Sequence, residues 1–155
     1  MKLSLLVATV LALGVVGCSQ EPDIQLNNES QINWQNGRAN TVVVNYFAEW
    51  CTPCLRELPE LNEFYHNEVS DDSQLTLIGI SFDPMSNQQI NALAEKHDID
   101  FPLALSLPAP KLPFDKPGML PATYIVGPGG KVTGPLLGEQ TRASLRKAIA
   151  KARSE

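Results

Sequence analysis

The apolar positions of this chain follow two patterns, which predict strands and helices in alternation. Continuous runs of β-branched and aromatic residues at 41–47 and 75–82 are typical of strands that are buried on both faces. Between them, apolar residues recur at helical spacing over residues 52–67. Two parallel buried strands need a crossover connection, which is usually a helix. The pattern therefore predicts a β-α-β unit at the centre of the fold.

Further elements follow toward the C-terminus. A second amphipathic helix is predicted at residues 87–97 and a short strand at residues 101–105. Strands at 122–126 and 131–137 are separated by a Gly-Pro-Gly-Gly turn and are expected to form a β-hairpin. Thr141 is expected to cap a last helix, whose C-terminal half is basic. The order β-α-β-α-β-β-β-α predicts an α/β fold with a central mixed sheet flanked by helices.

Two segments show neither pattern. Residues 107–121 contain five prolines, and a segment so stiff and so poor in N–H donors is expected to be a surface loop. Residues 18–37 are rich in Gln, Asn, Glu and Asp. Their start is expected to be a tether close to a membrane. Their second half has spaced apolar residues and is a candidate strand. The spacing is too sparse to decide between a strand and a continued tether.

The first residues read as a signal peptide. Lys2 precedes an apolar or small run at residues 3–16, which is short for a membrane-spanning helix of about 20 residues. The run leads into Val-Val-Gly-Cys18, which resembles the lipobox of bacterial lipoproteins and implies lipidation of Cys18. An ordinary secretory signal with an incidental cysteine is the alternative. Residues 1–17 are therefore expected to be a lipoprotein signal peptide, and residues 38–155 one compact domain.

Charge and cysteine content narrow the function. The net charge is −5, and no cluster of Lys or Arg is long enough to follow a phosphate backbone, so nucleic acid is not an expected partner. Three cysteines are too few for a disulfide scaffold, and their positions separate Cys18 from the close pair Cys51 and Cys54. Different roles are therefore expected for the anchor cysteine and for the pair.

The Cys-x-x-Cys pair stands at the predicted strand-to-helix turn, which is a redox signature. Amide dipoles at a helix N-terminus stabilise a thiolate, the species that attacks disulfides, so Cys51 is the expected nucleophile. Cys54 follows one turn later and can resolve the mixed disulfide, and Trp50 is expected to shield one side of the pair. A zinc site needs a second pair of ligands, but His66 and His97 lie far off in sequence, so no metal or cofactor is expected.

The segment Phe-Ala-Glu-Trp-Cys-Thr-Pro-Cys at 47–54 resembles the active-site signature of thioredoxins. Its continuation at 55–61 is similar to the TlpA/ResA/DsbE branch, whose members often carry Cys-x-x-Glu-x-Pro here. The segment Leu-Pro-Ala-Thr-Tyr-Ile-Val at 120–126 is similar to the family's cis-proline segment. The resemblance covers about residues 38–153. It implies a thioredoxin fold and an extracytoplasmic, membrane-anchored enzyme that is generally reducing.

The resemblance also implies roles for individual residues. A cis Pro121 packs opposite the redox-active disulfide, and Leu120 offers backbone hydrogen bonds to an extended substrate segment, with Trp50 beside them. Asn45 stands where thioredoxins carry a buried, proton-handling aspartate. Glu57, one turn after the second cysteine, is the candidate for that catalytic role, and an acid favoured by the helix dipole is the equal alternative.

Partners and location follow from the same resemblance. It implies protein disulfides or dithiols as substrates and a membrane reductase of the DsbD/CcdA type as the source of electrons. Its implied place is the periplasmic side of a bacterial membrane, reached through the lipid anchor. Apocytochrome c is the family's common client, so cytochrome c maturation is the implied process.

Three other functions are weighed against this interpretation. An oxidant or isomerase uses the same cysteines, because direction depends on reduction potential. Copper chaperones of related fold use two cysteines and a distant histidine, but usually space the cysteines by three residues, whereas two intervene here. A peroxidase of the peroxiredoxin type would use Cys54 as its reactive cysteine. Peroxiredoxins place proline and threonine before that cysteine, but this chain has Phe47 and Cys51 at those positions, which argues against a peroxidase.

Overall fold

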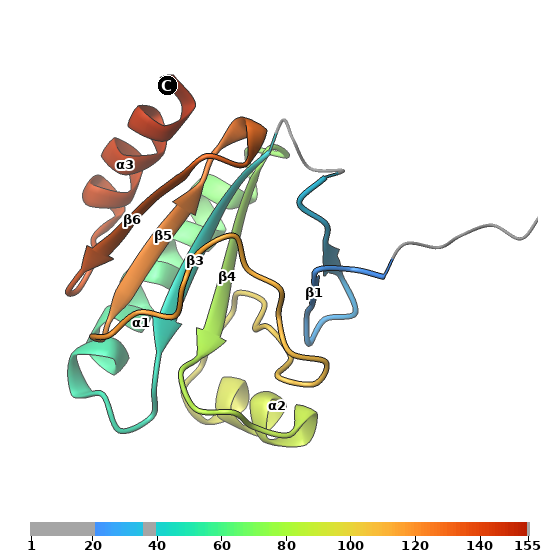
Figure 1. The fold of residues 1–155 in the computed structure, drawn as a ribbon. Helices are drawn as coiled ribbons and strands as arrows, with labels where there is room; N and C mark the ends of the chain where they lie inside the picture. The colour runs from blue at the N-terminus through green and yellow to red at the C-terminus, as the bar shows by residue number, and fades with distance from the viewer. Residues whose placement is uncertain (1–20, 36–39, 155) are drawn as a thin grey trace, which may run out of the picture.

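The computed structural model describes residues 21–35 and 40–154, so the predicted signal peptide and the lipidation site Cys18 lie outside the described residues. Its centre is a four-stranded mixed sheet in the order β4-β3-β5-β6 (Figure 1). The strands are β3 (Thr41–Phe47), β4 (Leu75–Ser81), β5 (Ala122–Val126) and β6 (Val132–Leu137). β3 is parallel to β4 and antiparallel to β5. All seven residues of β3 are buried, as its continuous apolar run predicted.

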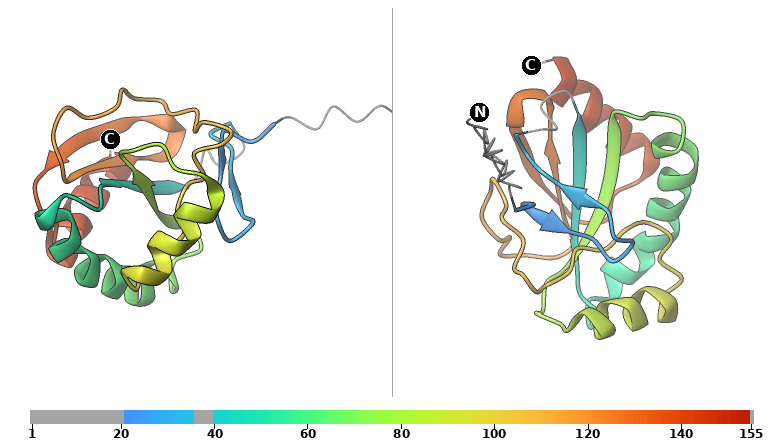
Figure 2. Two further views of the ribbon diagram at one scale, coloured as in Figure 1. Left: turned by 90° about the horizontal axis from the view of Figure 1, so that it is seen from below. Right: turned by 90° about the vertical axis from the view of Figure 1, so that its right-hand side faces the viewer.

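Three helices pack on one face of this sheet, as the view along it shows (Figure 2). They are α1 (Thr52–Phe64), α2 (Asn87–Lys96) and α3 (Arg142–Ser154), and α1 continues into a π-helical turn at Tyr65–Val69. Their buried residues Leu61, Ile90 and Leu145 share one core with strand residues such as Val43 and Leu77. In the described part of the chain, no helix is long and apolar enough to cross a bilayer.

The opposite face of the sheet is covered by segments without helices. One is the proline-rich segment, residues 107–121, which is irregular as predicted (Figure 2). The other is a separate antiparallel pair, β1 (Ile24–Gln25) and β2 (Gln31–Ile32). The two are joined through Lys111, whose N–H donates to the Asp23 carbonyl at 2.8 Å and whose carbonyl accepts from Trp34 Nε1 at 2.8 Å. Residues 21–35 of the polar N-terminal segment are therefore built into this face, including part of the predicted tether.

The predicted strand at residues 101–105 is wrong. Only single bridges form there, between Leu103 and Gly79 and between Ala104 and Leu26. The reason lies in where the hydrogen bonds go. Along β4, the Gly79 N–H donates to the Pro102 carbonyl at 2.9 Å and the Gly79 carbonyl accepts the Ala104 N–H at 2.8 Å, but Pro102 has no N–H to continue the ladder. On the other side, the Leu103 N–H and carbonyl bond to Asn27, each at 2.9 Å.

Candidate active site

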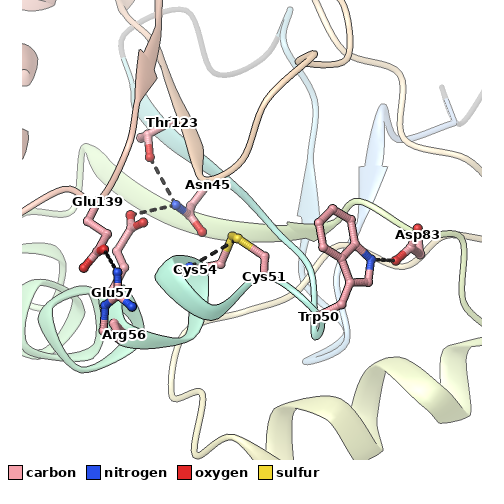
Figure 3. The surroundings of a disulfide bond; sticks show 9 residues. All are labelled: Asn45, Trp50, Cys51, Cys54, Arg56, Glu57, Asp83, Thr123 and Glu139. Atoms are coloured by element: carbon pink, nitrogen blue, oxygen red, sulfur yellow. Dashed lines mark hydrogen bonds and ion pairs between the residues drawn. A yellow bond between two sulfur atoms is a disulfide. The ribbon is translucent and has the colours of Figure 1, made fainter.

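The two cysteines lie where β3 passes into α1. Cys51 is the N-cap residue of α1, and its sulfur accepts the backbone N–H of Cys54 at 3.3 Å. The two side chains are joined in a disulfide (Figure 3). Cys51 is 5% exposed and Cys54 1%, so the Cys51 sulfur belongs to the more accessible residue of the pair. This position gives Cys51 the helix N-terminus that the sequence predicted for the nucleophile.

Trp50 and Glu57 flank the disulfide on opposite sides (Figure 3). Trp50 is 65% exposed, and its indole N–H donates to Asp83 Oδ2 at 2.6 Å. Its ring also meets Phe82 edge-on, with the ring centroids 6.2 Å apart. The indole is therefore held in place although it faces solvent, which is the arrangement expected of a contact surface beside the sulfurs.

Glu57 is almost completely buried on the other side. Its Oε1 accepts a hydrogen bond from Asn45 Nδ2 at 2.9 Å, and its Oε2 has no partner among the described residues. Burial is the main cause that raises the pKa of Glu57 to about 8. The Gln140 backbone opposes this shift, the nearby charge of Glu139 adds to it less strongly, and the Asn45 hydrogen bond opposes it least. The carboxyl group is therefore neutral near pH 7 and can exchange a proton at mildly alkaline pH.

Asn45 of β3 links this strand to β5 and to α1 beside the disulfide. Its Nδ2 donates both to Glu57 and to Thr123 Oγ1 of β5, the latter at 3.1 Å (Figure 3). All three residues are buried. Sequence reasoning singled out Asn45 and Glu57 separately but missed Thr123. Its position two residues after Pro121, which the family resemblance sets opposite the disulfide, is the signal that could have found it.

The predicted cis-proline segment reaches the same end of the sheet. The Leu120–Pro121 peptide bond is cis, as predicted. β5 begins directly after it, and Ala122 pairs with Tyr46, near the end of β3 that leads to the cysteines. Pro121 therefore lies at the cysteine end of the sheet.

The two histidines do not join the cysteines. His66 pairs with Asp100 at 2.8 Å, and His97 lies 3.4 Å from Glu49. Within residues 21–35 and 40–154, no group of three or more His, Cys, Asp or Glu residues is arranged to hold a metal ion.

Comparison with known proteins places this site in a family. Residues 19–134, most of the chain, match the model of the AhpC/TSA family. The chain belongs to the AhpC/TSA family. Within it, the chain is 24% identical over 147 residues to the thioredoxin-like protein YneN of Bacillus subtilis strain 168, covering 88% of this chain and 81% of the relative.

The chain is also 26% identical over 145 residues to the thiol-disulfide oxidoreductase ResA of Geobacillus thermodenitrificans, covering 91% of this chain and 78% of the relative. Its fold is similar to that of StoA from Bacillus subtilis, with a TM-score of 0.65, 18% identity, and 81% of this chain and 92% of that chain covered. The predicted thioredoxin-like fold and the resemblance to ResA-type proteins are confirmed. So is the predicted enzyme class, thiol–disulfide oxidoreductase.

Proposed function

We propose that this member of the AhpC/TSA family reduces protein disulfides by dithiol exchange through Cys51 and Cys54, outside the cytoplasm and held at a membrane. The observation that carries the proposal is the position of the disulfide. The Cys51 sulfur caps α1 and accepts a backbone N–H, which stabilises a thiolate there once the pair is reduced. Cys54, the more buried of the two, is suited to attack inside the protein rather than to meet a substrate.

The reaction runs in two exchanges. In the first, the Cys51 thiolate attacks one sulfur of the substrate disulfide, a mixed disulfide forms, and the other substrate sulfur leaves as a thiolate and takes a proton. In the second, the Cys54 thiolate attacks the Cys51 sulfur, the intramolecular disulfide forms, and the substrate leaves as a second thiol. The substrate gains two electrons and two protons, and the enzyme becomes oxidised.

Glu57 is suited to take the Cys54 proton before the second exchange. It lies one helical turn after Cys54, is buried, and has a free Oε2 among the described residues. Asn45 cannot titrate, so it cannot replace the carboxyl group, but its amide holds Oε1 in place. Trp50, Leu120 and Pro121 are proposed to contact the substrate segment around the reacting sulfur.

Location and partners complete the proposal. Residues 1–17 are proposed to be a signal peptide, with Cys18 the lipidated first residue of the mature protein on the periplasmic side of a bacterial membrane. Electrons then come from a membrane reductase of the DsbD/CcdA type, and apocytochrome c is the proposed client. The relatives named thiol-disulfide oxidoreductase ResA support the exchange reaction itself.

The reduction potential of the full-length protein tests the direction of exchange. The protein is equilibrated in thiol buffers, and the oxidation state of the Cys51–Cys54 pair is read by alkylation and mass. A value near about −270 mV supports a reductant, and a value near about −120 mV makes the protein an oxidant instead. If no disulfide forms between the two cysteines under any buffer, the oxidoreductase function itself fails.

A trapping experiment tests the two cysteine roles. Reduced Cys54→Ser is expected to accumulate a mixed disulfide with a protein substrate, because nothing resolves it. Cys51→Ser is the matched control and is expected to accumulate none, since its remaining thiol is buried. Equal trapping by both variants would contradict the assignment of Cys51 as nucleophile.

A further inference from the structure

Trp50 is held by residues that do not belong to the active-site helix. The indole N–H is bonded to Asp83 and the ring packs edge-on against Phe82, and both residues lie just beyond the end of β4. An indole that is 65% exposed has little packing of its own to fix its orientation. Its position beside Cys51 therefore depends on how well Phe82 and Asp83 are held.

Lys116 of the proline-rich segment holds Phe82. Its Nζ donates to the Phe82 carbonyl at 2.7 Å and lies 3.6 Å from the centroid of the Phe82 ring, which is a cation–π geometry. Pro117 is buried, so the backbone next to Lys116 is fixed on the domain although the lysine is exposed. Phe114 adds a second anchor, because its ring stacks on Tyr124 at 3.9 Å.

The same segment then reaches the cysteine end of the sheet, where Ala122 pairs with Tyr46. Only three residues separate Lys116 from Leu120, and the cis bond to Pro121 follows at once. Met119, between them, is 65% exposed. The proline-rich segment thus fixes Trp50 through Phe82 at one end and supplies Leu120 and Pro121 at the other.

We propose that Lys116 is a positioning residue for substrate binding, and that residues 116–121 select an extended polypeptide disulfide over a small-molecule disulfide. The proposal rests on the proposed function, since it concerns the substrate of the same dithiol. A polypeptide segment that pairs with the Leu120 backbone also lies against the indole face, so it gains from a fixed Trp50. A small disulfide reaches Cys51 without touching both Leu120 and the indole, so a fixed Trp50 strengthens its binding little.

The test compares Lys116→Met with Lys111→Met. Both variants remove one exposed ammonium group from the same segment, but only Lys116 contacts Phe82; the Lys111 contacts to Asp23 and Trp34 use its backbone and survive substitution. Rates are measured with oxidised insulin as the polypeptide disulfide and with glutathione disulfide as the small one. The indole N–H NMR signal of Trp50, one of two tryptophans, reports the position of the ring.

Lys116→Met is expected to raise KM for insulin about fivefold with kcat unchanged, the factor that corresponds to one exposed cation–π contact. Its rate with glutathione disulfide is expected to stay at the wild-type level, and its Trp50 signal to shift. Lys116→Arg keeps a cation over the Phe82 ring, so its KM for insulin and its Trp50 signal are expected to stay at the wild-type values. Lys111→Met is expected to change neither.

Two results would overturn the proposal. An unshifted Trp50 signal in Lys116→Met would show that Lys116 does not position the indole. Equal losses with insulin and glutathione disulfide would show that residues 116–121 do not select between them. If the wild-type protein exchanges with neither disulfide, the proposed function fails, and a shifted Trp50 signal in the variant still supports the positioning role of Lys116.

Discussion

The side-chain amide of Asn45 donates a hydrogen bond to Oε1 of Glu57 across 2.9 Å, inside the core beneath the disulfide. A neutral donor from a central strand thus holds a buried acid that comes from the active-site helix. Because Asn45 does not titrate, the charge of this buried pair depends on Glu57 alone. The two residues therefore lead to separate predictions.

Glu57→Gln is expected to remove a pH-dependent step from exchange. In the wild-type protein, release of the mixed disulfide should accelerate as pH rises through about 8, where the buried carboxyl group ionises and can take the Cys54 proton. The glutamine variant should lack this inflection, and stopped-flow rates between about pH 6 and 10 measure it. Glu60→Gln, at an exposed position on the same helix, is the control. If Glu57→Gln showed the same pH–rate profile as the wild-type protein, Glu57 would have a structural role only and would not transfer the proton.

Stability should also fall with rising pH because of Glu57. Its pKa is about 8 in the folded protein, against an ordinary value of 4.5, so between these values the folded state holds a proton that the unfolded state has lost. The free energy of unfolding therefore decreases across this window, on the order of 5 kcal/mol in total. Urea unfolding of the oxidised protein at several pH values measures the slope, which Glu57→Gln is expected to flatten. A slope that the substitution leaves intact would contradict the raised pKa.

Glu68 is expected to show the opposite pH dependence. Its carboxylate contacts Arg146 and Arg142, and these hydrogen bonds hold its pKa below the ordinary value. The stability it contributes is present above the unfolded pKa and is lost as pH falls through the folded one. Glu68→Gln should cost roughly 0.5–1 kcal/mol at neutral pH and little at about pH 3. Glu63→Gln, with one longer contact to Arg142, should cost less; an equal cost would contradict the assignment.

Asn45→Ala is expected to move the Glu57 inflection to higher pH. The hydrogen bond from Asn45 lowers the pKa of Glu57, so its removal lets burial raise that pKa further. The loss of a donor to a buried acid should also cost about 1–3 kcal/mol in urea unfolding. Thr123→Val removes the other acceptor of Asn45 but keeps the bond to Glu57, so its inflection should stay in place. A shift of the same size in Thr123→Val would mean that the pKa follows packing and not this bond.

Gly79→Ala is expected to destabilise the edge of the sheet. A Cβ at this position of β4 would come within 2.6 Å of Leu103 Cδ2 and 3.0 Å of Phe101 Cε2, both side chains of the core. Overpacking of this kind costs about 1–3 kcal/mol, which denaturant unfolding measures. Gly118→Ala is the matched control, since a Cβ there meets nothing within 4 Å. A Gly79 variant as stable as the control would show that residues 101–103 yield easily.

The local hydrophobic pattern was sufficient to predict the elements whose conformation is set by their own residues. The buried run of β3, the amphipathic spacing of α1 and the cysteines between them are all readable in about 25 consecutive residues, because a strand and a helix impose periods on the chain that forms them. The β5–β6 hairpin also followed from a short segment, and the cis bond before Pro121 followed from the family resemblance of residues 120–126. The predicted strand at 101–105 is reduced to isolated bridges, because Pro102 has no N–H to continue a ladder along β4.

The sequence by itself determined the fold class, the redox-active pair and its place at the start of a helix. Tertiary structure alone decided what surrounds that pair: that Asn45 joins Glu57 to Thr123, and that Lys116 reaches Phe82 and so fixes Trp50. These contacts link segments 12 to 78 residues apart, and no period in the chain encodes them. They arise when the sheet and its covering segments pack, because only then do burial and hydrogen bonding choose which polar groups meet.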